Sequence, residues 1–200
     1  MSGAIDVAII DSGGANLASL QFALERLGAR ALVSSDAGII ATAGRVLLPG
    51  VGAAANAMHR LRAAGLAELI PTLRVPLLGI CLGMQLLFEH SAEGDTACLG
   101  IIAGGVERLT PAPGMPVPHM GWNTLEAIGE DPLLAGIDAA DYLYFVHSYA
   151  APLSDSTTAA VRYGQPVAAA VRRDNFRGVQ FHPERSAAVG STILRNFLAL

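Results

Sequence analysis

The sequence is poor in cysteine, and it has no long apolar run. Its 200 residues include two cysteines, Cys81 and Cys98, too few for a disulfide framework, and this indicates a reducing, cytoplasmic location. The CxxC and Cys/His spacings of zinc sites are absent, so we expect no metal site. No 18 consecutive residues are apolar without an interrupting charge, proline or glycine, so we expect no membrane span. The first ten residues have no basic region before an apolar stretch, and we predict no signal peptide.

Charge is also scarce. The 13 basic and 17 acidic residues give a net charge of −4, which argues against a chain that neutralises nucleic-acid phosphates. The 52% of hydrophobic residues excludes general disorder. Such a charge-poor chain suggests that a partner covers part of its surface. A GxGxxG phosphate-binding loop is absent, so we predict no dinucleotide site.

Short apolar runs alternate with helical patterns in the first half. This alternation predicts parallel strands joined by helices, and the continuous apolar runs favour a sheet that is covered on both faces. Gly28 is a plausible residue to end the first helix. We predict strands over residues 5–10, 45–48 and 75–80, and helices over residues 16–27, 53–64 and 82–89.

The second half changes character after a segment rich in glycine and proline, residues 94–118. The closely spaced apolar runs that follow predict an antiparallel extension of the sheet, with a final helix over residues 189–200. We therefore predict one domain, residues 1–200, of the α/β class, with a doubly wound, mostly parallel sheet. The runs of the extension are residues 142–149, 156–163, 167–172 and 178–181.

A candidate nucleophile lies where the third strand meets its helix. Residues 79–83 read Gly-Ile-Cys-Leu-Gly, the pattern of a nucleophile elbow with cysteine in place of serine. Cys81 would then lie at a helix N-terminus, which favours the reactive thiolate. A buried structural cysteine is the alternative from this pattern alone. Cys98 has no such setting and reads as a packed thiol.

A candidate base follows the last strand. His182 emerges from an apolar run, and Glu184 lies two residues on, so both side chains lie on one side of an extended chain. Pro183 favours that extended conformation. A carboxylate beside an imidazole orients it and stabilises its charged form, as in a catalytic triad. Seen alone, the segment could be an exposed turn.

A candidate oxyanion site closes the second strand. Residues 49–52 read Pro-Gly-Val-Gly, and the two glycines would let the Val51 peptide turn toward developing charge. The second donor would be the N–H of Leu82, directly after the nucleophile. Without the nucleophile, an ordinary turn is the simpler reading.

These motifs together resemble the class I, triad-type glutamine amidotransferases. The resemblance rests on residues 79–85 (Gly-Ile-Cys-Leu-Gly-Met-Gln) and 180–184 (Gln-Phe-His-Pro-Glu). Residues 49–52, 118–123 (Pro-His-Met-Gly-Trp-Asn) and 144–149 (Tyr-Phe-Val-His-Ser-Tyr) resemble, within that class, the glutaminase subunits of imidazole glycerol phosphate synthase. The resemblance implies a flavodoxin-like sheet and covers almost the whole chain.

The resemblance implies a glutaminase reaction without metal or cofactor. Cys81 attacks the side-chain amide of glutamine, His182 transfers the protons, and Glu184 orients His182. The N–H groups of Val51 and Leu82 hold the oxyanion, and water then releases glutamate. The residues implied to hold glutamine are Gly52, Gln85, Glu93, Ser148 and Tyr149. Outside the resemblance, Gln85 reads as a helix-surface amide and Glu93 as a solvated carboxylate.

The resemblance also implies a partner. In this family ammonia passes to a (βα)8-barrel cyclase subunit in a heterodimer, and the cyclase makes imidazole glycerol phosphate for histidine biosynthesis. Ammonia would become ammonium in bulk water, so the interface has to be sealed. The residues implied at the interface or ammonia exit are Asn16, Trp122, Tyr144 and Arg185. A core tryptophan and an exposed surface arginine are the alternative readings of Trp122 and Arg185.

Some histidines and some departures from the family pattern need separate mention. His119 and His147 read as structural histidines, whereas His59 and His90 read as helix-surface residues. Ser12 stands where the family usually has an aromatic residue, and an arginine replaces the usual lysine after His-Pro-Glu. Ala15 and Ala54 also replace the usual glycine and phenylalanine.

Three other functions remain open at this point. The chain could serve another class I amidotransferase, such as the anthranilate or pyridoxal phosphate type. It could be a non-enzymatic regulatory subunit on the same fold, although a scaffold needs no triad. It could also be a stand-alone thiol hydrolase.

Overall fold

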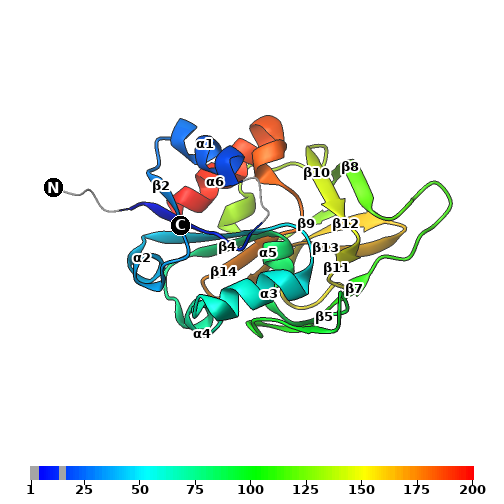
Figure 1. Cartoon of the computed structure of the whole chain (residues 1–200). Helices are drawn as coiled ribbons and strands as arrows, with labels where there is room; N and C mark the ends of the chain where they lie inside the picture. The colour runs from blue at the N-terminus through cyan, green and yellow to red at the C-terminus, as the bar shows by residue number, and fades with distance from the viewer. Residues whose placement is uncertain (1–4, 14–16) are drawn as a thin grey trace.

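The computed structural model describes residues 5–13 and 17–200. An eight-stranded sheet in the order β2-β1-β3-β4-β14-β13-β12-β9 runs through the molecule, and helices cover both its faces (Figure 1). The five strands from β2 to β14 are parallel, and the other three are antiparallel. This confirms the predicted parallel sheet with an antiparallel extension. The bounds are β1 Val7–Ile10, β2 Ala31–Ser34, β3 Arg45–Gly50, β4 Leu77–Cys81, β9 Ala127–Ile128, β12 Thr157–Tyr163, β13 Gln165–Arg173 and β14 Phe176–Val179.

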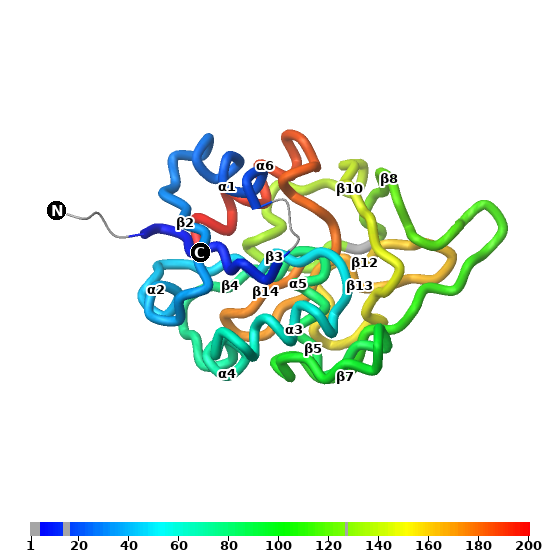
Figure 2. Tube along the Cα trace, viewed as in Figure 1, coloured from blue at the N-terminus to red at the C-terminus, as the bar shows by residue number. Residues whose placement is uncertain are grey.

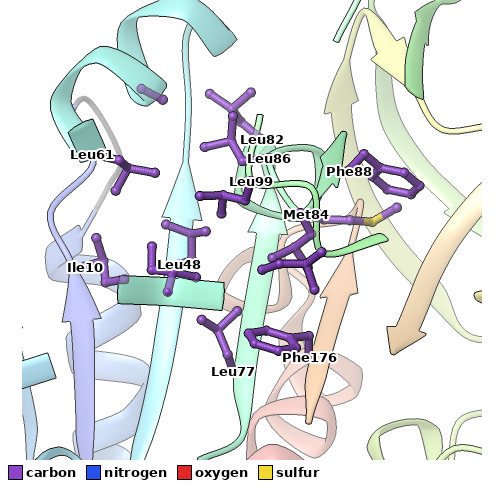
Figure 3. Packing of buried hydrophobic residues seen from close by; sticks show 14 of the residues in the cluster. Ile10, Leu48, Leu61, Leu77, Leu82, Met84, Leu86, Phe88, Leu99 and Phe176 are labelled. Atoms are coloured by element: carbon purple, nitrogen blue, oxygen red, sulfur yellow. The ribbon is translucent and has the colours of Figure 1, made fainter. Parts of the chain in front are cut away.

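Side-chain alternation along the parallel strands builds a separate core on each face of the sheet. On β1, Ala8 and Ile10 pack into one core, whereas Val7 and Ile9 pack into the other. Both cores are fully apolar at these positions, which explains why the strands read as continuous apolar runs. Figure 3 shows the first core, in which side chains from β1, β3 and β4 meet those of the neighbouring helices.

The helices divide between the two cores. The first and last helices, α1 (Leu17–Arg26) and α6 (Ala187–Ala199), lie side by side on one face (Figure 2). Gly28, just after α1, has a positive φ of 84°, the conformation that favours glycine at the end of a helix, as predicted. Among the described residues, no helix has both the length and the apolar character to cross a membrane. The other face carries α2 (Ala37–Thr42), α3 (Ala54–Ala63), α4 (Leu66–Leu69) and α5 (Leu82–Gln85).

Two small sheets extend the molecule beyond the main sheet. The ribbon of β8 (His119–Thr124) and β10 (Tyr142–His147) is antiparallel. The predicted strand over residues 142–149 breaks at residue 148, because β10 pairs with β8 whereas β11 pairs with β7. The second small sheet contains β5 (Phe88–Ser91), β6 (Thr96–Ala97), β7 (Ile102–Arg108) and β11 (Tyr149–Ala150). The short 3-10 helices are η1 (Ile70–Thr72), η2 (Pro132–Leu134) and η3 (Pro183–Arg185).

The predicted helix over residues 82–89 is wrong in its second half. Helix α5 ends at Gln85, and the chain enters β5 at Phe88, where it pairs with β7. Residues 82–88 are all buried, so no polar face marks how far the helix extends. His90 therefore lies on a strand, where it contacts Asp95 at 2.8 Å, and it is not a helix-surface residue. His59 lies exposed on α3 as predicted.

Candidate active site

Cys81 occupies a strained turn between β4 and α5. Its φ of 54° and ψ of −111° are unusual for a residue with a side chain. Both flanking positions require glycine, because a side chain at either would collide with backbone atoms. A Cβ at Gly79 would lie 2.6 Å from the carbonyl oxygen of Gly83, and a Cβ at Gly83 would lie 1.7 Å from the carbonyl oxygen of Leu48. The Gly-x-Cys-x-Gly segment therefore has the backbone of a nucleophile elbow.

Val146 and Gln180 lie within hydrogen-bonding reach of the Cys81 sulfur. The thiol donates to the carbonyl oxygen of Val146 at 3.7 Å, and the side-chain amide of Gln180 donates to the sulfur at 3.8 Å. Gln180 is oriented in turn by Gln85, whose Nε2 donates to Gln180 Oε1 at 2.9 Å. No role was predicted for Gln180. Its position two residues before His182 places both on one side of an extended chain, and this alternation could have identified it.

His182 and Glu184 form the predicted pair. His182 Nδ1 lies 2.8 Å from Glu184 Oε1, and only 8% of each side chain is exposed. Burial lowers the pKa of His182, but the neighbouring Cys81 and Glu184 outweigh it and raise the pKa to about 10. The pair therefore favours the imidazolium form. His182 Nε2 and Glu184 Oε2 are buried without a hydrogen-bond partner in the described part of the chain.

A fully buried serine fixes the backbone of His182. Ser186 Oγ donates to the carbonyl oxygen of His182 at 2.7 Å and accepts the N–H of Tyr144 at 3.0 Å. The N–H of His182 also donates to the carbonyl oxygen of Tyr144 at 2.9 Å. The end of β14 is thereby tied to β10. No sequence pattern indicated Ser186, because its partners are backbone groups brought together only by the fold.

A cavity of about 450 Å³ surrounds these groups at the carboxyl ends of β3 and β4. Open α/β sheets bind ligands at this edge. All three predicted triad residues line the cavity. Its walls are formed by Leu20, Pro49, Gly50, Val51, Gly52, Ile80, Cys81, Leu82, Glu93, Pro118, Val146, His147, Ser148, Tyr149, His182, Glu184 and Arg185.

The predicted oxyanion segment lies beside the nucleophile. Strand β3 pairs with β4 so that Gly50 is opposite Cys81, and Val51 and Leu82 both line the cavity. Gly52 has a φ of 85°, a conformation that suits glycine. Behind this segment, the hydroxyl of Ser12 donates to the carbonyl oxygen of Pro49 at 2.6 Å.

The residues predicted to hold glutamine divide into two groups. Gly52, Glu93, Ser148 and Tyr149 line the cavity. One carboxylate oxygen of Glu93 accepts the N–H of Ala54 at 2.8 Å, at the start of α3. Gln85 is buried and is not one of the lining residues; its side chain donates to the carbonyl oxygen of Tyr149 at 2.8 Å. It is therefore not the helix-surface amide of the alternative reading, and it does not line the cavity, but it supports Tyr149.

Three residues predicted at the interface lie close together beside the cavity. The side chain of Arg185 lies over the ring of Tyr144 at 4.4 Å, and Trp122 meets the same ring edge-on at 5.8 Å. Trp122 is 52% exposed, so it is not the core tryptophan of the alternative reading. Asn16 and Ala15 lie outside the described residues.

The remaining predicted residues have structural surroundings. His119 and His147 are buried, and burial lowers the pKa of each to about 4, so both are neutral at neutral pH. Burial raises the pKa of the Cys98 thiol to about 11, which is consistent with a packed, unreactive thiol. Within residues 5–13 and 17–200, no three His, Cys, Asp or Glu side chains are grouped so that they could hold a metal ion.

Comparison with known proteins identifies the family. The family model "Glutamine amidotransferase class-I" matches residues 8–200. The imidazole glycerol phosphate synthase subunit HisH of Xanthomonas euvesicatoria pv. vesicatoria (strain 85-10) is 57% identical over 195 residues, covering 98% of both chains. HisH of Xylella fastidiosa (strain Temecula1) is 54% identical over 195 residues, with the same coverage.

Solved structures support the fold. A glutamine amidotransferase superimposes with a TM-score of 0.75 at 20% identity, covering 97% of each chain. A glutamine amidotransferase from Thermotoga maritima superimposes with a TM-score of 0.66 at 17% identity, covering 98% of this chain and 83% of that chain. The chain therefore belongs to the class I glutamine amidotransferase family and, within it, to the HisH subunits of imidazole glycerol phosphate synthase.

Proposed function

We propose that this chain hydrolyses glutamine to glutamate and ammonia and delivers the ammonia to a cyclase subunit. The observation that carries the proposal is the meeting of Cys81, on its strained turn, with the buried His182–Glu184 pair in one cavity. Acyl transfer from an amide requires a nucleophile, a base and a group that orients the base, and the free Cys81, His182 and Glu184 can fill these roles.

The first half of the reaction forms a thioester. His182 holds the proton of the Cys81 thiol, as its raised pKa favours, and the sulfur attacks the side-chain carbonyl carbon of glutamine. The N–H groups of Val51 and Leu82 stabilise the oxyanion. The imidazolium then gives its proton to the departing nitrogen, the carbon–nitrogen bond breaks, and ammonia leaves. Glu184 stabilises the imidazolium throughout, as the raised pKa of His182 supports.

The second half regenerates the enzyme. His182 accepts a proton from water, and the resulting hydroxide attacks the thioester carbon. The carbon–sulfur bond breaks, glutamate is released, and the proton returns to the Cys81 sulfur. One glutamine and one water thus give one glutamate and one ammonia. A catalytic thiol has to stay reduced, which is consistent with a cytoplasmic location.

The proposed partner is a (βα)8-barrel cyclase in a heterodimer. The exposed Trp122 and the adjoining Tyr144 and Arg185 form an aromatic and cationic surface beside the cavity. Tryptophan, tyrosine and arginine are the residues most often found at the energetic centre of interfaces. In the proposal, ammonia leaves the cavity at this surface, because the cyclase has to receive it without contact with bulk water.

The test is glutamate release by the purified chain, alone and with a cognate barrel cyclase and its ribotide ligand. We expect low activity alone, a large rise with the liganded cyclase, and none for Cys81→Ala. Cys98→Ala is the matched control and should retain full activity. High activity alone, unchanged by the cyclase, would indicate an independent glutaminase or hydrolase. No activity in any mixture would favour the interpretation that the chain is a non-enzymatic regulatory subunit on the same fold.

A further inference from the structure

Two buried histidines lie opposite each other on the ribbon of β8 and β10. His119 and His147 are paired across the ribbon, and His119 Nδ1 lies 3.1 Å from His147 Nε2. The ring of His119 stacks with the rings of Phe145, at 4.9 Å, and Tyr163, at 4.0 Å. His119 and His147 are called the histidine pair below. His147 also lines the active-site cavity, so the pair connects the ribbon to the wall of that cavity.

The contact between His147 and Tyr149 determines which ring nitrogens of the histidine pair carry a hydrogen. His147 Nδ1 lies 2.9 Å from the carbonyl oxygen of Tyr149, which can only accept a hydrogen bond. His147 Nδ1 therefore carries the hydrogen. In a neutral imidazole the other nitrogen is then an acceptor, so His119 Nδ1 has to donate to His147 Nε2. This leaves His119 Nε2 as an acceptor.

The hydrogen bonds of Asn123, at the His119 end of the pair, independently require His119 Nε2 to be an acceptor. Asn123 Oδ1 accepts the N–H of Thr124 at 2.8 Å, and Asn123 Nδ2 donates to the carbonyl oxygen of Arg162 at 3.0 Å. These two bonds orient the carboxamide, so Nδ2 also faces His119 Nε2 as a donor, at 3.4 Å. Hydrogen bonds thus run in one direction from Asn123 through the histidine pair to Tyr149.

The chain of hydrogen bonds exists only while both histidines are neutral. A proton added at His147 Nε2 would face the N–H of His119 Nδ1, and a proton added at His119 Nε2 would face the side-chain amide of Asn123. The pKa of each ring is lowered to about 4, mainly by burial. For His147 this value also includes a lowering by His119 and His182 and an opposing rise from the bond to Tyr149. At neutral pH both rings are therefore uncharged, and His147 Nδ1 donates a hydrogen bond to the carbonyl oxygen of Tyr149.

We infer that the histidine pair positions the Tyr149 carbonyl and, through it, the wall formed by residues 148–149 in the glutamine cavity. The inference rests on the proposed function, in which this cavity binds glutamine. Tyr149 O accepts from both His147 Nδ1 and Gln85 Nε2, so both of its lone pairs are used within the protein. His119 and His147 are thus positioning residues for substrate binding.

The first test reads the tautomers directly and needs no activity. Long-range ¹H–¹⁵N NMR of the imidazole rings in the wild-type chain at pH 7 should show both histidines as neutral Nδ1–H tautomers. His59, exposed on α3, gives the signals of a solvent-exposed ring in the same spectra and serves as the control. An Nε2–H tautomer at His147, or a charged ring at pH 7, would overturn the inference.

The second test measures glutamine binding by calorimetry in the Cys81→Ala chain, which cannot turn glutamine over. His147→Phe keeps a ring but loses both nitrogens, and we expect it to weaken glutamine binding about tenfold. His147→Asn keeps a donor near the position of Nδ1 and should restore binding to within about threefold. His59→Asn is the matched control and should bind normally.

The same variants separate binding from chemistry. In the complex with the liganded cyclase and with Cys81 intact, His147→Phe should raise KM about tenfold and leave kcat within about threefold. Unchanged binding and KM in His147→Phe would overturn the inference. If the Cys81→Ala chain fails to bind glutamine both alone and in the complex with the liganded cyclase, the proposed function fails. The tautomers then decide whether the histidine pair holds Tyr149.

Discussion

Gly83 has the tightest backbone approach in the nucleophile elbow, and alanine there should reduce both stability and activity. A Cβ on Gly83 would lie 1.7 Å from the carbonyl oxygen of Leu48, whereas real Cβ contacts are essentially never shorter than 3.0 Å. The obstacle is backbone, which cannot rotate away as a side chain can. Strand β3 and helix α5 would therefore have to separate by at least about 1.3 Å.

The size of both effects follows from that displacement. Overpacking of this kind costs about 1–3 kcal/mol, and a domain of this size loses roughly 2–4 °C in Tm for each kcal/mol. We expect Gly83→Ala to lower Tm by about 2–12 °C. The displaced strand carries Gly50, which lies opposite Cys81. A misplacement of 1 Å in reacting groups costs about 100-fold in rate, so kcat should fall by about that factor.

The assay is thermal unfolding of the chain together with glutamate release in the cyclase complex. Gly38→Ala is the matched control, because its Cβ on α2 would lie 3.1 Å from a side-chain oxygen of Asp36 and would meet no backbone atom at a shorter distance. Alanine has a higher helix propensity than glycine, so this control should keep or raise Tm and leave kcat unchanged. A Gly83→Ala chain with the Tm and kcat of the wild type would refute the steric argument.

Three further predictions concern side chains around the cavity. Glu184→Gln should lower the pKa of His182 from about 10, measured by NMR titration, and reduce glutamate release; an unchanged pKa would contradict the assigned cause. Ser12→Ala removes the hydrogen bond from the Ser12 hydroxyl to the carbonyl oxygen of Pro49. We expect the free energy of unfolding, measured in urea, to fall by about 1 kcal/mol. An unchanged free energy would show that this hydrogen bond does not contribute to stability. The histidine pair, with pKa values lowered from 6.5 to about 4, stabilises the fold above pH 6.5, and this contribution is lost as pH falls toward 4. Urea midpoints from pH 7 to 4.5 should therefore fall less steeply when both rings are replaced by phenylalanine, and equal slopes would refute this.

The parallel half of the sheet could be predicted because its strands carry their own signal. Residues 7–10, 46–48 and 77–81 are buried on both faces of the sheet and flanked by turns or helices, which makes them short, continuous apolar runs. The small sheets could not be predicted in the same way. Strand β5 follows α5 after two buried leucines, so nothing in its own residues separates helix from strand. Only the pairing of β5 with β7, a long-range contact, decides it.

The residues of the predicted triad were accessible to sequence reasoning because their chemistry needs fixed local spacing. The Gly-x-Cys-x-Gly turn and the His-Pro-Glu segment are each contained in five residues or fewer. The supports of the triad have no such spacing. Ser186 acts on Tyr144 across 42 residues, and Gln85 reaches Tyr149 across 64. Such contacts depend on how the strands are arranged in space, which no local pattern records.

Strand β10 is the element in which these supports meet. Its Tyr144 carbonyl oxygen accepts the N–H of His182, its Val146 carbonyl oxygen accepts the Cys81 thiol, and its His147 holds the wall of the cavity. The same strand pairs with β8 so that Tyr144 lies opposite the exposed Trp122. A cyclase docked on that tryptophan, as proposed, would press on a strand in contact with the nucleophile, the base and the substrate wall together. A shift of β10 would change all three at once, because the strand joins them through its own backbone. Dependence of glutaminase activity on the partner would then need no other moving element.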